Sequence, residues 1–262
     1  MRFKSLSSVI ALAVALTLQA QQPQQQQQGP KPKSKGEQEA LQKVQEAAQA
    51  QNYDAELQAI NSVLENYADT EYKPLLLNMA MDAAQRKGDQ AQTSVYADRL
   101  IQADPNNIPA RVMMAESIAS HTRENDLDKD QSLKKVDDYA SKALDLLKTA
   151  DTPPLGMNPA QWPDYKKELT SQAYDALGQA ADLRKNYPDA IKDFQAAIQA
   201  QPANSVSMAR LSKAYVGAKQ YDDAISTADK VLAMNDAPAS VKQFAQSQKD
   251  AATKLKAAPA AK

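Results

Sequence analysis

Acidic side chains between residues 126 and 137 have the spacing of a calcium-binding loop. Five oxygen-bearing residues stand at relative positions 1, 3, 5, 7 and 12 of such a loop: Asp126, Asp128, Asp130, Ser132 and Asp137. However, Gln131 stands where the loop needs glycine for its turn, and Asp137 replaces the bidentate glutamate. We therefore expect a solvated polar loop rather than a metal site, with weak calcium binding through Asp126, Asp128 and Asp130 as the alternative.

Other chemistry-bearing residues do not form a catalytic set. The chain has no cysteine, one histidine and six glycines, so thiolate and multi-histidine metal sites are excluded, and no phosphate-binding glycine motif occurs. His121 is expected at a helix end, where the helix dipole favours a cation. Trp162 is expected to pin an irregular segment to the core, with a binding anchor as the alternative. We predict that the protein is not an enzyme and needs no cofactor.

The first 20 residues have the pattern of a secretory signal. Arg2 and Lys4 precede an apolar run from Val9 to Leu18, and Ala20 offers a small residue for cleavage. The run is shorter than the about 20 apolar residues that span a bilayer, so we expect a cleaved signal, with an uncleaved anchor as the alternative. Removing residues 1–20 leaves 29 basic residues against 32 acidic residues, a net charge of −3. We expect an exported protein of the periplasm or cell envelope, without nucleic acid partners or stable membrane insertion.

Residues 21–36 are rich in glutamine, proline and lysine. Such a segment buries too little apolar surface to offset the entropy cost of ordering its backbone, so we predict a disordered spacer. The alternative is an attachment arm that carries Lys31, Lys33 and Lys35.

The remainder of the chain is rich in alanine and consists of amphipathic segments that repeat. Shifting residues 171–202 by 34 positions gives eight identities: Ser171 with Ser205, Leu177 with Leu211, Ala180 with Ala214, Lys185 with Lys219, Tyr187 with Tyr221, Asp189 with Asp223, Ala190 with Ala224 and Ile191 with Ile225. Within the first copy, apolar residues recur at spacings of three and four on both sides of Pro188, which suits the start of a new helix. Each copy is therefore expected to form two antiparallel helices.

These residues resemble the tetratricopeptide repeat family, whose repeat has 34 residues. The residues that match its pattern are Tyr174, Leu177, Gly178, Ala190, Phe194, Ala197 and Pro202. Ala181 departs from the pattern, because the family prefers tyrosine there. The resemblance implies an all-α, right-handed superhelical solenoid of antiparallel helix pairs, covering residues 37–236 and closed by a C-terminal capping helix.

Five units fit this interpretation, at about residues 37–68, 74–105, 108–149, 165–202 and 205–236. Pro105 and Pro202 are 97 residues apart, so two units occupy that interval and the excess falls in loops. One excess is the turn at residues 122–131, and the other is a proline-rich insertion at residues 150–163, after which Asp164 is expected to cap a helix from Tyr165. Residues 237–257 are expected to form the capping helix and residues 258–262 a tail.

The family resemblance also implies a concave groove lined by the first helix of each unit. Its polar candidates for partner binding are Asn78, Asp82, Gln85, Glu116, Gln172, Asp175, Gln179, Asp182 and Lys213, joined by Val112 and Val216. Amides could pair with the main chain of an extended peptide, and the acids would favour basic segments. The alternative is that these residues form only the hydrated inner face of a scaffold.

The predicted function is a non-enzymatic scaffold of the bacterial cell envelope that binds an extended peptide or partner domain. The alternative is a permanent structural subunit of an envelope complex. A third class, an enzyme or glycan-binding protein, is disfavoured by the absence of a catalytic set and by the low aromatic content of 5%.

Overall fold

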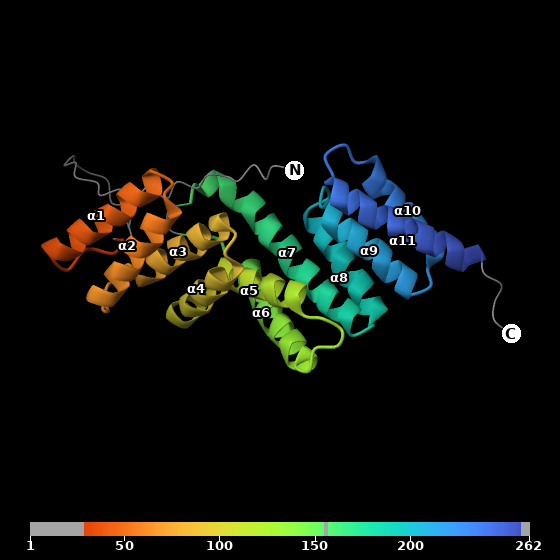
Figure 1. Ribbon diagram of the computed structural model, residues 1–262, viewed down its shortest axis with the longest axis horizontal. Helices are drawn as coiled ribbons and strands as arrows, with labels where there is room; N and C mark the ends of the chain where they lie inside the picture. The colour runs from red at the N-terminus through yellow and green to blue at the C-terminus, as the bar shows by residue number, and fades with distance from the viewer. Residues whose placement is uncertain (1–28, 155–156, 258–262) are drawn as a thin grey trace. The chain divides into compact units, whose positions relative to one another are not determined.

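The computed structural model describes residues 29–154 and 157–257 (Figure 1). The expected signal (1–20), the first half of the expected spacer (21–36) and the expected tail (258–262) lie outside the described residues. Regular structure in the described part is entirely helical. The helices are α1 (Lys35–Gln49), α2 (Tyr53–Asn66), α3 (Lys73–Lys87), α4 (Gln90–Ala103), α5 (Ile108–His121), α6 (Lys129–Thr149), α7 (Trp162–Leu183), α8 (Tyr187–Ala200), α9 (Ser205–Gly217), α10 (Tyr221–Ala233) and α11 (Ala239–Ala257), with a short 3-10 helix at Pro159–Gln161.

The chain divides into two compact units. The N-terminal unit contains residues 29–110 together with the described part of residues 152–159, and the C-terminal unit contains residues 111–151 and 160–257. Within each unit, helices that follow one another along the chain pack together, including α1 with α2, α3 with α4, α7 with α8 and α9 with α10. The predicted all-α fold of consecutive helix pairs is therefore confirmed.

Aliphatic side chains form the core of the N-terminal unit. Leu57, Ile60 and Val63 of α2 are buried, as are Leu76 and Leu77 of α3. Such side chains each contribute about 1.5–3 kcal/mol when they are fully buried. The helices of this unit therefore owe their stability mainly to the burial of apolar stripes rather than to polar contacts.

The helices of the N-terminal unit begin and end at residues suited to those positions. Ser34, Asn52 and Asp89 cap the starts of α1, α2 and α4, each accepting a hydrogen bond from a backbone N–H of the first turn. Gly88 ends α3 in a left-handed conformation with φ of 74°. These local signals fix where the chain turns between helices.

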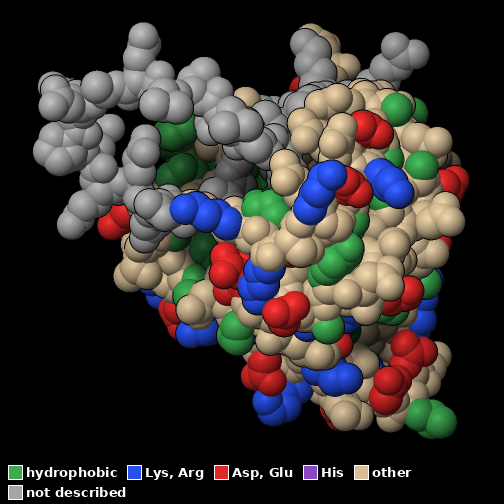
Figure 2. Space-filling model, turned by 90° about the vertical axis from the view of Figure 1, so that its left-hand side faces the viewer, with side chains coloured by type: hydrophobic (Ala, Val, Ile, Leu, Met, Phe, Trp, Pro, Cys, Tyr) green, Lys and Arg blue, Asp and Glu red, His purple; other side chains and the backbone are tan. Residues whose placement is uncertain are grey.

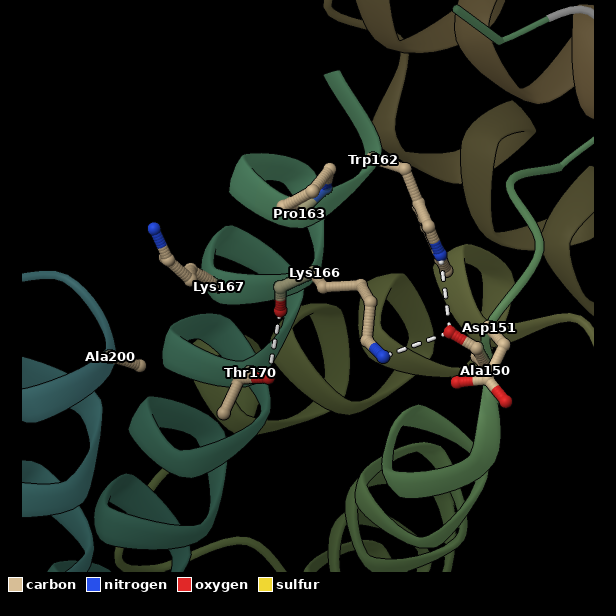
Figure 3. Close-up of a pocket in the computed structure, with 8 residues that line it drawn as sticks. All are labelled: Ala150, Asp151, Trp162, Pro163, Lys166, Lys167, Thr170 and Ala200. Carbon is tan, nitrogen blue, oxygen red and sulfur yellow. Dashed lines mark hydrogen bonds between the residues drawn. The ribbon is translucent and has the colours of Figure 1, made fainter. Parts of the chain in front are cut away.

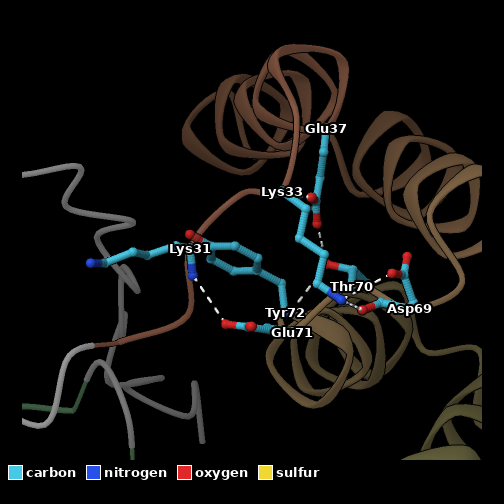
Figure 4. Close-up of polar contacts among 7 residues, drawn as sticks. All are labelled: Lys31, Lys33, Glu37, Asp69, Thr70, Glu71 and Tyr72. Atoms are coloured by element: carbon cyan, nitrogen blue, oxygen red, sulfur yellow. Dashed lines mark hydrogen bonds and ion pairs between the residues drawn. The ribbon is translucent and has the colours of Figure 1, made fainter.

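Residues 30–34, which the sequence places in the spacer, lie against the N-terminal unit (Figure 4). We call them the N-terminal strap. The Lys33 Nζ lies 3.0 Å from Asp69 Oδ2, and the Tyr72 hydroxyl donates to the Pro30 carbonyl oxygen at 2.7 Å. The buried Glu37 carboxylate accepts from the Lys33 backbone N–H at 2.6 Å and from the Thr70 hydroxyl at 2.5 Å. Polar contacts therefore hold this segment, although it has little apolar surface to bury.

The C-terminal unit packs a phenylalanine ring directly over a glycine. A Cβ atom added to Gly178 of α7 would lie 2.7 Å from Phe194 Cδ1 of α8. Phe194 is 1% exposed and belongs to a cluster with Leu211 and Ala214 of α9, against which Tyr215 also packs. Phe194 is therefore buried between α8 and the first helix of the next repeat. The absence of a side chain at Gly178 is what lets the two helices approach this closely.

Helix α7 begins three residues earlier than the sequence predicts. Asp164 does not cap it, because Gln161 precedes the helix and Asp164 lies in the first turn, where its charge suits the helix dipole. Pro163 occupies the first turn, where its missing N–H costs no hydrogen bond. The structure thus moves Trp162 and Pro163 from the insertion to the helix.

The last helix, α11, packs against both α9 and α10. Its buried Ala245 belongs to a cluster with Ala209 of α9 and with Ala228 and Val231 of α10, and Val241 packs against that cluster. Lys249 adds an ion pair with Asp229 at 2.6 Å.

None of the described helices has the length and apolarity to span a bilayer.

Candidate functional site

A cleft with a volume of about 390 Å³ opens in the C-terminal unit. It is lined by residues from α5, α7, α8, α9 and α11 and from the residue that follows α5: Ala119, Ser120, Thr122, Gln179, Asp182, Leu183, Phe194, Val206, Ala209, Arg210, Lys213, Ser240, Val241 and Phe244. Three predicted groove residues are among them, namely Gln179, Asp182 and Lys213. The structure therefore brings these three residues together in one cleft.

Asp175 lies beneath this polar wall and is held by three side chains. Its carboxylate accepts from the Ser207 hydroxyl at 2.7 Å and from the Gln179 amide at 3.0 Å, and it forms an ion pair with Arg210. The Asp175 residue is only 4% exposed. Burial raises its pKa, although Arg210, Ser207 and Gln179 all oppose that shift. Asp175 therefore joins α7 to α9 and does not present its charge to a partner.

The second acid of the cleft, Asp182, is also neutralised within the chain. Its carboxylate lies 2.6 Å from Lys213 Nζ, so α7 and α9 are joined a second time. The Asp182 side chain is mostly buried, whereas half of the Lys213 side chain is exposed. The expected acid-lined groove is thus a wall of ion pairs that offers both donors and acceptors.

Glu116 of α5 is a further acid whose charge is disfavoured by its surroundings. Burial, together with the nearby charges of Asp175 and Glu168, raises its pKa to about 7, and Arg210 opposes this shift. Burial also raises the pKa of Glu168 on α7. Near neutral pH, Glu116 is therefore close to half protonated.

The remaining predicted groove residues have different surroundings. Gln172 is part-buried on α7. In the N-terminal unit, Asn78 is part-buried, Gln85 is exposed, and Asp82 lies 2.7 Å from Arg86 on α3. The apolar candidates are covered, because Val112 is buried and Val216 is part-buried.

Sequence reasoning missed two parts of the cleft. Arg210 was overlooked because its role depends on Asp175, which lies 35 residues earlier on another helix. The apolar wall formed by Val206, Val241 and Phe244 was overlooked because α11 was expected only to cover the end of the stack. A signal was present, since Phe244 is the one aromatic residue of α11.

The residues of the candidate calcium loop do not gather around a common point. Asp126 Oδ2 accepts from the Arg123 backbone N–H at 2.6 Å, whereas Asp137 forms a bidentate pair with Arg184 at 2.7 and 3.2 Å. Among the described residues, no group of three or more acidic or histidine side chains is placed to hold a metal ion. His121 is exposed at the end of α5, with its Nδ1 atom 2.7 Å from the Ser117 carbonyl oxygen.

A second cavity, of about 450 Å³, lies beside Trp162 (Figure 3). The Trp162 indole N–H and the Lys166 ammonium both donate to the Ala150 carbonyl oxygen, at 3.1 and 2.8 Å. These two bonds satisfy the carbonyl oxygen of Ala150, the residue at the C-terminal end of α6. Trp162 thus attaches the start of the irregular segment to α7, as expected for a tryptophan that pins this segment to the core. Both donors are therefore already used within the chain, and we do not place the binding site at this cavity.

Charges on the face drawn in Figure 2 are mixed in sign. Lysine and arginine side chains alternate with aspartate and glutamate side chains over that face rather than gathering in a patch. A mixed surface does not produce the strong positive field that attracts nucleic acid.

Comparison with known proteins finds a repeat family and solved structures of similar fold. The family model described as tetratricopeptide repeat matches residues 183–246. The crystal structure of MamA protein is similar with a TM-score of 0.55 and 13% identity, covering 86% of this chain and 98% of that chain. A thermophilic tetratricopeptide repeat protein of Thermus thermophilus, TTC0263, is similar with a TM-score of 0.51 and 14% identity, covering 81% of this chain and 98% of that chain. A comparison with curated proteins finds no match.

The described helices share the fold of solved tetratricopeptide repeat proteins, and residues 183–246 match the model of the repeat itself. The resemblance noted from the sequence is therefore confirmed: residues 183–246 carry the repeat, and the described helices have the fold of tetratricopeptide repeat proteins. Such repeats are in general non-enzymatic modules for protein–protein interaction.

Proposed function

We propose that this protein holds an extended segment of a partner protein in the cleft of its C-terminal unit. The observation that carries the proposal is the convergence of Gln179, Asp182 and Lys213 at one cavity. The two ion pairs that join α7 to α9 keep this wall in place before a partner arrives. A site that is already ordered loses little entropy on binding.

The chemistry of the wall suits a peptide main chain. An extended main chain presents N–H donors and C=O acceptors in alternation. Gln179 supplies both kinds of group, Lys213 supplies donors and Asp182 supplies acceptors. The expected preference for basic segments is not supported by the cleft, because Asp175 and Asp182 are already paired within the chain.

The N-terminal unit offers a weaker surface of the same kind. Asn78 and Gln85 of α3 remain proposed contact residues, whereas Asp82 is engaged by Arg86. We place the primary site in the C-terminal unit, because the cleft lies there.

We also propose that the protein acts after export, in the periplasm or cell envelope. This proposal rests on the sequence pattern of residues 1–20. Sequencing the N-terminus of the protein from its native host tests it. A mature chain that starts near Gln21 supports export, and a chain that retains Met1 in the cytoplasm contradicts it.

Selection from a library of random ten-residue peptides tests the binding function. The wild-type protein should enrich a shared motif, and Lys213→Ala and Gln179→Ala should each weaken binding of the selected peptide about three- to tenfold, because each removes a hydrogen-bonding group. Lys192→Ala changes an exposed lysine of α8 outside the cleft and is the matched control.

Three results would contradict the proposal: no enrichment above a bare support, equal binding by all variants, or a loss caused by the control alone. Binding that is insensitive to 1 M salt would favour a permanent subunit of an envelope complex over a transient scaffold, because ion-paired contacts weaken with salt.

A further inference from the structure

The capping helix contributes apolar surface to the cleft. Five large hydrophobic side chains are exposed in the described part of the chain: Val95, Leu127, Val206, Phe244 and Leu255. Val206 and Phe244, which are 38% and 37% exposed, both line the cleft. Exposed apolar side chains that cluster at a cavity indicate a binding surface more strongly than scattered ones do.

The geometry of α11 explains how one helix can serve both the core and the cleft. Val241 and Phe244 lie three residues apart, so they share a face of the helix. Val241 packs against the cluster that contains Ala209 and Ala245, and it also lines the cleft. The same residues that attach α11 to α9 and α10 therefore hold Phe244 at the edge of the cavity.

We infer that α11 is the specificity wall of the site, and that the cleft accepts one apolar side chain, aromatic or branched aliphatic, from an extended partner segment. This inference rests on the proposed function and names the chemistry of the partner. The cavity of about 390 Å³ lies near the lower end of the about 300–1,000 Å³ usual for ligand sites. It therefore accommodates one or two side chains rather than a folded element.

The charges of the cleft favour this occupant over a charged anchor. Asp182 and Lys213 neutralise each other, and Arg210 is held by Asp175. A charged side chain that entered the cavity would lose its hydration without meeting an unpaired opposite charge. An apolar side chain gains from contact with Phe244 and Val206, while the flanking main chain reaches Gln179 and Lys213.

A panel of defined peptides tests the inference. The probes are acetylated and amidated pentapeptides Ala-Ala-X-Ala-Ala, with X as Phe, Leu, Ala or Glu, and binding to the intact protein is followed by amide chemical-shift changes. We expect the Phe and Leu peptides to shift the amides of Val206 and residues 240–244 and to bind about tenfold more tightly than the Ala and Glu peptides.

Two variants of α11 form a matched pair. Phe244→Ala should weaken binding of the Phe peptide about tenfold, whereas Leu255→Ala, which removes an exposed apolar side chain outside the cleft, should leave it unchanged. Val206→Ala should weaken binding about threefold and provides a second test that does not alter α11. Circular dichroism confirms that each variant is folded.

The inference is overturned if the four peptides bind alike, if the shifts are confined to α10 or to the N-terminal unit, or if Phe244→Ala binds like the wild type. Failure of this inference can be distinguished from failure of the proposed function. If the peptide selected from the random library requires Lys213 and Gln179 but not Phe244, the groove remains a binding site and only the role of α11 is wrong.

Discussion

The second repeat and the fourth repeat have the large and the small buried residue at exchanged positions. Subtracting 97 residues, the separation of Pro202 from Pro105, places Gly178 on Met81 and Phe194 on Ala97. The α7 and α8 pair combines a glycine with a phenylalanine, and the α3 and α4 pair has methionine and alanine at the same positions. All four residues are buried.

We infer that the repeat constrains the combined side-chain volume at these two positions more than it constrains the residue at either one. Each pair of positions has one small and one large buried residue, and the large residue is on α8 in the fourth repeat and on α3 in the second. Only the fourth repeat has the ring against bare backbone, because Gly178 has no Cβ.

The two regions also differ in how they treat charge. The same shift of 97 residues places Asp175 on Asn78. The C-terminal unit buries an ionisable side chain with Arg210, whereas the N-terminal unit has a neutral amide at that position. A buried ion pair does not always stabilise a fold relative to neutral residues, but it is costly to break once it is there.

The largest expected effect is at Phe194. Phe194→Ala should lower the free energy of unfolding by about 3–5 kcal/mol, because it leaves a cavity above Gly178. Gly178→Met alone should cost about 1–3 kcal/mol through overpacking. The double variant, which copies the second repeat, should be more stable than the sum of the single effects by more than about 1 kcal/mol. Urea unfolding measures all three, and additive effects would show that the positions do not compensate.

The next effect is at Arg210. Arg210→Ala should destabilise the protein by about 3 kcal/mol, because it leaves the Asp175 carboxylate buried without its charge partner. Adding Asp175→Asn, which copies the second repeat, should restore most of the loss. The fluorescence of Trp162, the single tryptophan, reports unfolding of this unit. A double variant no more stable than Arg210→Ala would show that Arg210 acts through packing instead.

A third prediction uses a feature that the two units share. Burial raises the pKa of Glu56 in the N-terminal unit and of Glu116 in the C-terminal unit to about 7, from an ordinary value of 4.5. Between these values the folded protein holds more protons than the unfolded chain, so the free energy of unfolding should fall as pH rises from about 4.5 to 7.

Replacing each glutamate by glutamine isolates its contribution to this pH dependence. Glu56→Gln and Glu116→Gln should each raise the stability at pH 8 by about 1–3 kcal/mol and leave the stability at pH 4.5 nearly unchanged. Denaturant unfolding at both pH values measures this difference. A variant that is less stable than the wild type at pH 8 would contradict the assignment.

The smallest effect concerns the N-terminal strap. Lys33→Ala removes the ion pair with Asp69 and should speed hydrogen exchange in residues 30–34 without shifting the melting temperature measurably, because exposed ion pairs contribute little. Lys43→Ala, which changes an exposed lysine of α1, is the control. If exchange in the strap is unchanged, then Tyr72 and Glu37 hold it without Lys33.

Helix pairs could be predicted from the sequence because their signals are local. The spacing of Tyr174 and Leu177 and the turn before Pro188 depend on residues within one repeat. The groove candidates followed from the family resemblance, but whether their charges were available depended on contacts across repeats, as between Asp182 and Lys213. The contribution of α11 to the cleft depends on how this helix packs against α9 and α10, and its amino-acid composition alone does not predict that packing.

Hydrogen exchange with and without the selected peptide tests the central claim most directly. The account predicts slower exchange in the amides of α7, α9 and α11 around Gln179, Lys213 and Phe244 when the peptide is bound. Protection confined to α10, or to the helices of the N-terminal unit, would contradict it.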